Sequence, residues 1–215
     1  MTITWLGQSC FKIQDKDATL VTDPYGESVG FKLPRLSADI VTTSHDHDDH
    51  NNVSAVSGTT GSPFIISGPG EYEVKGIFVY GIPAWHDKSE GKERGANTIY
   101  RIEVEGLSIV HLGDLGHTLS EETVAKLEGV DILLIPVGGK WTIGTNEAVL
   151  VISELEPRIV IPMHYKIPGL KVDVDPVDKF LKEMGASKAE KLPKLKIAKK
   201  DLPQEETKVI LLERG

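Results

Sequence analysis

The feature that most constrains this chain is a cluster of histidines and aspartates that directly follows an apolar stretch. Residues 40–43 have the β-branched composition of a buried strand, and residues 45–50 are all His or Asp. The cluster contains three of the seven histidines in the chain. Because imidazole and carboxylate groups suit zinc, iron and other divalent metals, the cluster predicts a metal site. A polar surface loop that binds metal only weakly is the disfavoured alternative.

The spacing within the cluster indicates two metal ions. In an extended segment His45 and His47 point to the same side, because side chains alternate along a strand, and they can bind one ion together. If the chain then turns into a helix, Asp49 and His50 are directed elsewhere. These two residues can then bind a second ion.

Further metal ligands must come from distant segments. Three residues stand directly after predicted strands, where loops leave a sheet and functional groups are common: His86, Asp114 and His164. Together with the cluster, each of them is expected to bind metal. His111 alternates with apolar neighbours, so we expect it to be packed or to contact a ligand. His117 could be a proton donor, a contact of a ligand or merely exposed, and these roles stay open.

Short strands separated by turns fill the first half of the chain. The predicted strands are Thr2–Leu6, Cys10–Gln14, Ala18–Thr22, Asp39–Thr43, Phe64–Ser67, Tyr72–Val74, Ile77–Gly81, Thr98–Val104 and Leu107–Leu112. Residues 105–106, Glu-Gly, predict a tight hairpin turn between the last two.

Helices and strands alternate in the second half. Helices are predicted over residues 120–127, 146–155 and 175–185, and strands over 131–137, 158–163 and 209–213. Ser120 is the expected N-cap of the first helix, and Pro176 is expected in the first turn of the third. This order predicts helices packed on sheets. We expect one layered α/β domain over residues 1–215, a length that suits a single domain.

Charge limits the partners of the chain. The formal net charge of −8 disfavours nucleic acid, which needs a basic face, and leaves a small anionic molecule as the expected substrate. Six lysines lie between residues 187 and 200. They could form a basic patch for anions, but a solvated face is the simpler interpretation.

Several remaining features bear on location. The single cysteine, Cys10, excludes a disulfide framework and a cysteine zinc cluster, and we expect it to be buried. The first residues lack the pattern of a signal peptide, and no apolar stretch reaches the roughly 18 residues of a membrane span. We therefore expect a cytoplasmic protein without a membrane partner, and a homo-oligomer is left open.

Gly138 and Gly139 begin a loop that we expect to lie over the site. The glycine pair could form a plain turn or allow the backbone to approach an anion closely, and a plain turn is the simpler interpretation.

The ordered motifs resemble those of the metallo-β-lactamase superfamily. The pattern His-x-His-x-Asp-His at residues 45–50 matches its full signature. Three later residues follow in the order of its third, fourth and fifth motifs: His86, Asp114 and His164. Asp23 resembles its early acidic residue, and Trp5–Ser9 resembles the opening of the ascorbate-6-phosphate-lactonase-like branch.

The resemblance implies a fold and a set of ligands. The fold would be a four-layer αββα sandwich with the site at one edge. The cofactors would be two divalent ions, in the first place Zn²⁺, with Mn²⁺ or Fe²⁺ as alternatives. The implied ligands of one ion are His45, His47 and His86; those of the other are Asp49, His50 and His164, with Asp114 bridging the two. Asp23 would orient a ligand or the loop that carries the cluster.

The activity implied is that of a metal-dependent hydrolase, in which a hydroxide bridging two metals attacks a small anionic ester, lactone or phosphodiester. Asp49 would orient the hydroxide while binding metal. The candidates for the proton donor are His117, Lys140 and Tyr165, and His117 is taken with Asp49 as catalytic. Asp114 stands where many true β-lactamases have cysteine, which argues against that activity. The alternatives are an iron-binding oxidoreductase of the same fold and a non-catalytic metal-binding protein.

Overall fold

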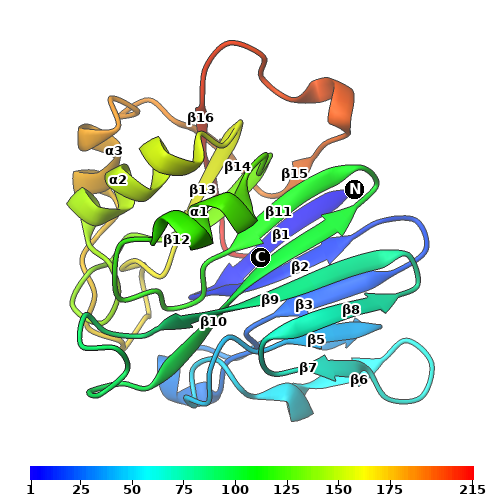
Figure 1. Ribbon diagram of the computed structural model, residues 1–215. Helices are drawn as coiled ribbons and strands as arrows, with labels where there is room; N and C mark the ends of the chain where they lie inside the picture. The colour runs from blue at the N-terminus through cyan, green and yellow to red at the C-terminus, as the bar shows by residue number, and fades with distance from the viewer.

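Two β-sheets lie face to face in the computed structural model, which describes residues 1–215 (Figure 1). The first sheet has the strand order β15-β1-β2-β3-β5-β7. Its strands are β1 (Thr2–Gly7), β2 (Cys10–Gln14), β3 (Thr19–Thr22), β5 (Ile40–Thr42), β7 (Phe64–Ile66) and β15 (Leu195–Lys196). The strands β3, β5 and β7 are parallel, so their carboxyl ends share one edge.

The second sheet has eight strands in the order β14-β16-β13-β12-β11-β10-β9-β8. They are β8 (Gly70–Val74), β9 (Ile77–Trp85), β10 (Ala96–Val104), β11 (Leu107–His111), β12 (Ile132–Pro136), β13 (Ile159–Met163), β14 (Glu190–Leu192) and β16 (Lys208–Leu212). The strands β11, β12 and β13 are parallel, and β9 and β11 are both antiparallel to β10 between them. The carboxyl ends of β9, β11 and β13 therefore meet at one edge of this sheet.

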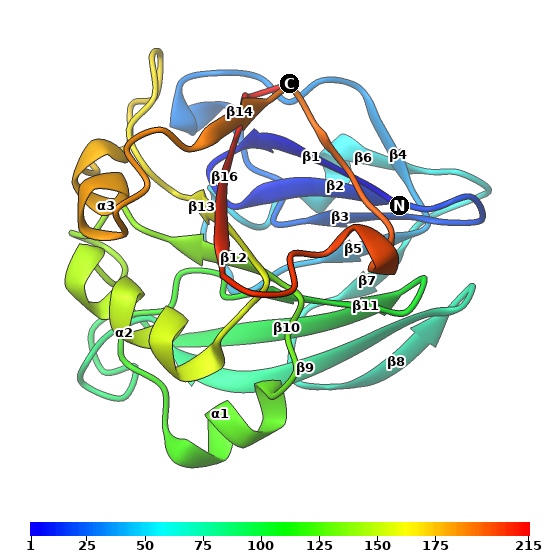
Figure 2. The same cartoon turned by 90° about the horizontal axis from the view of Figure 1, so that it is seen from above.

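The outer layers differ between the two sheets. The eight-stranded sheet is covered by α1 (Glu121–Leu127), α2 (Thr145–Leu155) and α3 (Asp178–Glu183), as Figure 2 shows. Over the six-stranded sheet lie short 3₁₀ turns, η1 (Glu27–Val29) and η2 (Val53–Ala55), and a two-stranded sheet of β4 (Leu36–Ala38) and β6 (Val56–Gly58). A further 3₁₀ turn, η3 (Lys199–Asp201), precedes β16. The predicted sandwich of layers is confirmed, with turns in place of α-helices in the fourth layer.

Alternation of side chains along the strands produces two apolar clusters. On β5, Ile40 belongs to the main core between the sheets, while its neighbour Val41 belongs to a smaller cluster beneath the 3₁₀ turns. Leu20 and Val21 on β3 divide in the same way. Cys10 lies in the smaller cluster and is fully buried, as predicted. Burial on both faces explains why these strands have continuous apolar runs.

The boundaries of the helices differ from prediction in physically clear ways. Ser120 is the N-cap of α1, as predicted, and its hydroxyl accepts a hydrogen bond from the Thr123 amide at 3.2 Å. The helix α2 begins one residue early, at Thr145, behind a glycine N-cap. The helix α3 begins two residues after Pro176. The amide of Asp175 donates a hydrogen bond to the Gly138 carbonyl, and its carbonyl accepts one from the Lys166 amide. These bonds keep the backbone of Asp175 out of the helix.

No helix is long and apolar enough to span a bilayer.

Candidate metal centre

The predicted ligands converge from loops at the ends of four strands. Residues 45–50 follow β5 of the six-stranded sheet. The other three ligands follow strands of the eight-stranded sheet: His86 after β9, Asp114 after β11 and His164 after β13. Because parallel strands bring their carboxyl ends to one edge, residues far apart in sequence meet there. The site lies where the edges of the two sheets come together.

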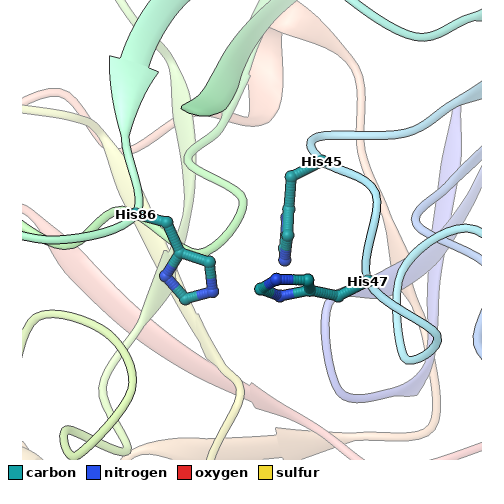
Figure 3. A group of neighbouring side chains, drawn as sticks. All are labelled: His45, His47 and His86. Carbon is teal, nitrogen blue, oxygen red and sulfur yellow. The ribbon is translucent and has the colours of Figure 1, made fainter. Parts of the chain in front are cut away.

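Three histidines form the first group of potential ligands. One ring nitrogen from each of His45, His47 and His86 lies within 4.8 Å of the others. Figure 3 shows the rings directed toward a common space, with two from the loop after β5 and one from the end of β9. The ring centroids of His45 and His86 are 4.6 Å apart. This is the arrangement in which three imidazoles can bind one ion.

A second group lies beside the first, and one carboxylate contacts both. Ligand atoms of Asp49, His50 and His164 also lie within 4.8 Å of one another. The Oδ2 atom of Asp114 is 3.3 Å from the Nε2 atoms of His50 and His164. The same oxygen is 3.5 Å from Nε2 of His86, a member of the first group. A single carboxylate oxygen thus stands between two possible ion positions.

The site contains buried nitrogens that the protein itself does not satisfy. The Nε2 atoms of His45, His50 and His164 are buried and have no hydrogen-bond partner. A buried polar atom without a partner costs about 1–3 kcal/mol, so such atoms are rare unless a ligand satisfies them. All three belong to the groups above. The residues therefore fit divalent ions.

The electrostatics of the site suit cations as well. Burial, and then the charge of His50, lower the pKa of His45 to about 3, so this imidazole is neutral and its lone pair is available. Burial acts to raise the pKa of Asp114, but His164 and His50 outweigh it and hold the pKa well below the usual value. Asp114 is therefore an ionised carboxylate in a buried position.

Asp23 holds two of the potential ligands in place. Its Oδ2 accepts hydrogen bonds from the Ser44 hydroxyl at 2.6 Å and from Nδ1 of His50 at 2.8 Å. Its Oδ1 accepts the Ser44 amide at 2.7 Å. The Ser44 hydroxyl in turn lies 2.9 Å from Nδ1 of His45. With both Nδ1 atoms engaged, the Nε2 atoms of His45 and His50 face the site, which is the arrangement that the predicted orienting role of Asp23 requires.

Comparisons with known proteins identify the family. Residues 2–164 match the model of the β-lactamase superfamily domain. The chain belongs to the metallo-β-lactamase superfamily. A UPF0173 metal-dependent hydrolase of Thermococcus onnurineus is 30% identical over 205 residues, covering 83% of this chain and 91% of that protein. A relative of the same designation from Methanopyrus kandleri is 26% identical over 214 residues, 86% of this chain and 93% of its own.

A solved structure resembles this superfamily member over almost its full length. It comes from Thermotoga maritima and is described as a candidate Zn-dependent hydrolase of the metallo-β-lactamase superfamily. The two chains share 36% sequence identity with a TM-score of 0.80, over 98% of this chain and 97% of the other. The prediction of a hydrolase of this superfamily is therefore confirmed. The narrower branch suggested by the opening residues stays a prediction.

Two histidines of this superfamily member lie outside the ligand groups. Nε2 of His111 donates to the Ser9 carbonyl at 2.8 Å, and Nδ1 accepts the Gly113 amide at 3.2 Å. The expected packed role of His111 is thus confirmed. Nε2 of His117 accepts the Trp85 amide at 3.1 Å, and Nδ1 donates to the Thr118 carbonyl at 2.6 Å. The Nδ1–H group of His117 would have to leave the Thr118 carbonyl to transfer its proton, and its catalytic role stays a prediction.

Sequence reasoning missed three polar residues beside the ligands. The buried amide of Gln8 donates to Asp49 at 3.5 Å, a long contact, and its Oε1 has no partner. Asn97 accepts the backbone amide of Asp114 at 3.0 Å. The hydroxyl of Ser9 contacts the carboxylate of Asp114 at 3.4 Å. Two signals were available for Gln8 and Ser9: they are polar residues in a tight turn between two strands, and they belong to the segment Trp5–Ser9 that carries part of the family resemblance.

Two glycines allow backbone segments to crowd around the site. A Cβ at Gly116 would overlap the backbone of His86, and a Cβ at Gly138 would overlap the carbonyl oxygen of His164. The close approach at Gly138 is therefore to protein backbone. The Trp141 amide bonds back to the Gly139 carbonyl at 2.6 Å. The glycine pair thus lies in a turn, and an approach of the Gly139 backbone to an anion stays a prediction.

Proposed function

We propose that the protein is a metal-dependent hydrolase that holds two divalent ions and cleaves a small anionic ester, lactone or phosphodiester. The observation that carries the proposal is the position of Asp114 Oδ2, within 3.5 Å of ring nitrogens in both histidine groups. One ion would be held by His45, His47 and His86. The other would be held by Asp49, His50 and His164, with Asp114 shared. Zinc is the first choice for this donor set, with Mn²⁺ or Fe²⁺ as alternatives.

Residues of the chain would position the metal ions and the nucleophile. When bound, two divalent ions supply an activated water as nucleophile and positive charge for the developing oxyanion. Asp49, which lies 3.6 Å from Nε2 of His50 at the partly exposed side of the site, orients that nucleophile. Asp23 fixes the ring orientations of His45 and His50. The candidate proton donors are His117, Lys140 and Tyr165. His117 and Lys140 each have present partners, Trp85 and Thr118 for the imidazole and Asp173 for the ammonium.

The charge of the protein supports a small substrate. A net charge of −8 repels a long polyanion, while a pair of cations in the site attracts a single phosphate or carboxylate. We also propose a cytoplasmic location, which the one buried and unpaired cysteine fits.

Elemental analysis combined with an activity screen tests the proposal. We expect about two divalent ions per chain after gentle purification, because seven ligand side chains suffice for two sites. The screen covers lactones, phosphodiesters and thioesters, with and without added zinc, manganese or iron. Metal content near zero, with no uptake of any added ion, would contradict the central claim. Bound metal without turnover on the whole panel would favour a non-catalytic metal-binding protein.

A further inference from the structure

A cavity adjoins the metal centre on the side of His86. Its volume is about 530 Å³, and two loops supply most of its lining: the segment after β9, with Arg94, and the segment before α2, with Trp141. Because His86 also lines it, a molecule bound in this cavity lies next to one of the potential metal ligands. The cavity is therefore the place where the part of a substrate that does not react can bind.

The loop after β9 is held rigidly by one carboxylate. Oδ1 of Asp87 accepts hydrogen bonds from the backbone amides of Ser89 at 2.7 Å and Gly91 at 2.9 Å. Oδ2 accepts hydrogen bonds from the backbone amides of Glu93 at 3.1 Å and Arg94 at 2.8 Å. Four backbone bonds to one side chain fix the path of the loop. The backbone that carries Arg94 is thus preorganised next to the ligand His86.

Arg94 is the one cation of the cavity that has no carboxylate partner. Lys88 is paired with Glu147 at 2.8 Å, and Lys140 is paired with Asp173 at 2.6 Å. Arg94 makes neither an ion pair nor a side-chain hydrogen bond. Its guanidinium carbon lies 4.1 Å from the centroid of the Trp141 ring. Stacking on the indole supports the guanidinium while its in-plane N–H groups stay free to donate.

We propose that Arg94, supported by Trp141, binds a second oxyanionic group of the substrate, a carboxylate or a phosphate separate from the group at the metal ligands. The inference rests on the proposed function and adds to it a substrate with two polar ends. The fork of guanidinium donors matches the paired oxygens of either group, and such charge-assisted bonds are strong. The neighbouring lysines cannot take this role without breaking their own ion pairs.

Binding of simple anions to the metal-loaded protein tests the inference. The probes are the α,ω-dicarboxylates from succinate to adipate, their ω-phosphono counterparts, and monocarboxylates of the same chain lengths. Isothermal titration calorimetry gives each dissociation constant. We expect at least one two-headed anion to bind about tenfold more tightly than its monocarboxylate, because only it reaches both the metals and Arg94. The Arg94→Gln variant should lose this advantage and bind monocarboxylates as the wild type does.

Two further variants separate the subsite from general charge. Lys88→Gln removes a paired cation from the same cavity and should keep the tenfold advantage. Trp141→Leu removes the stacking surface and should reduce the advantage about threefold. Trp141→Phe serves a spectroscopic purpose: binding of the two-headed anion should change tryptophan fluorescence less in this variant than in the wild type, because only Trp5 and Trp85 remain. Melting temperatures verify that each variant is folded.

The outcomes distinguish this inference from the proposed hydrolase activity. If no two-headed anion binds more tightly than its monocarboxylate, or if Arg94→Gln keeps the advantage, the inference is wrong, whatever the protein hydrolyses. If the Arg94-dependent advantage is found but no substrate is turned over, the anion subsite stands and only the hydrolase proposal fails.

Discussion

At the scale of single residues, Asp23 orients the potential ligands through its hydrogen bonds to His50 and Ser44. It is fully buried, yet its carboxylate is satisfied by bonds from Ser44 and His50. Burial acts to raise its pKa, but the hydrogen bond from His50 and the nearby histidines outweigh this effect and lower the pKa. An ionised Asp23 keeps the proton of His50 on Nδ1. The Nε2 atom is thereby directed into the site.

Asp23→Asn tests this control of ring orientation. Asparagine keeps the shape but lacks the charge, and its amide nitrogen cannot accept the bond from His50. We expect the affinity for zinc to fall roughly 10–100-fold, the range for residues that support metal ligands. Competition with a chromophoric chelator measures the dissociation constant. Circular dichroism serves as the folding control, and an unchanged zinc affinity would contradict the role assigned to Asp23.

His111 and His164 are both buried but should respond oppositely to alanine substitution. His111→Ala leaves the Ser9 carbonyl without its donor and opens a cavity, which should lower the free energy of unfolding by about 2–4 kcal/mol. Its metal content should not change. His164→Ala should remove metal and turnover while the sandwich persists. Urea unfolding and elemental analysis measure the two quantities, and the reverse pattern would show that the fifth-motif ligand is misassigned.

The sequence predicted the ligands better than their supporting contacts. The cluster at residues 45–50 is local, and His86, Asp114 and His164 each follow a recognisable strand. Asn97, in contrast, contacts Asp114 only because β10 and β11 pair as a hairpin. Such contacts depend on the register of the strands, which residue type alone does not specify.

At the scale of elements, most strands were predictable because they are apolar, whereas the short edge strands were not. The segment 190–196 is rich in lysine. The six lysines between residues 187 and 200 are all exposed, as expected. It nevertheless contains β14 and β15, which complete the edges of both sheets. Edge pairing of this kind follows from the position of the partner strand. The N-terminus of α2 was predicted one residue late. Gly144 is its N-cap, and the amide of Gly144 donates a hydrogen bond to the side chain of Glu147 at 3.2 Å.

The loop after β9 should depend on pH through Asp87. Burial acts to raise the pKa of Asp87, but the backbone amides of Arg94, Ser89, Glu93 and Gly91 outweigh it and lower the pKa. A lowered pKa in the folded state means that the stabilisation is present above the unfolded value of about 3.9 and is lost as the pH falls through the folded value. Asp87→Ala should therefore lower the hydrogen-exchange protection of residues 89–94 at about pH 6, and the difference from the wild type should shrink as the pH falls through the folded-state pKa of Asp87. Equal protection at the higher pH would contradict this account.

At the scale of the whole molecule, the metal centre joins the two sheets. One set of potential ligands follows β5 in the first sheet, and the others follow β9, β11 and β13 in the second. Removing metal with a chelator should lower the melting temperature without changing the far-ultraviolet circular dichroism, since the apolar core is independent of metal. Free zinc at a thousandfold excess over its dissociation constant stabilises a folded protein by about 4 kcal/mol. Scanning calorimetry with and without zinc decides this, and identical melting temperatures would contradict it.

The whole-molecule charge predicts weak binding to RNA. The lysines at 188, 191, 194, 196, 199 and 200 are all exposed, but Lys199 is paired with Asp131 at 2.7 Å. A titration with RNA at two salt concentrations should show no tight association. Strong binding that weakens steeply with salt, and that disappears when Lys194, Lys196 and Lys200 are replaced by glutamine, would show that the substrate class is wrong.

The pairing of β1 with β15 has a consequence for the order of events during synthesis. Ile3 lies opposite Leu195, so the outer edge of β1 stays unpaired during synthesis until the residues near position 195 have been made. The insertion of β16 between β13 and β14 is equally late. Contacts across such sequence distances form slowly, and an open strand edge invites pairing with other chains. The nascent polypeptide is therefore more vulnerable to aggregation than the finished molecule, and the time spent on the ribosome is when a chaperone would help it most.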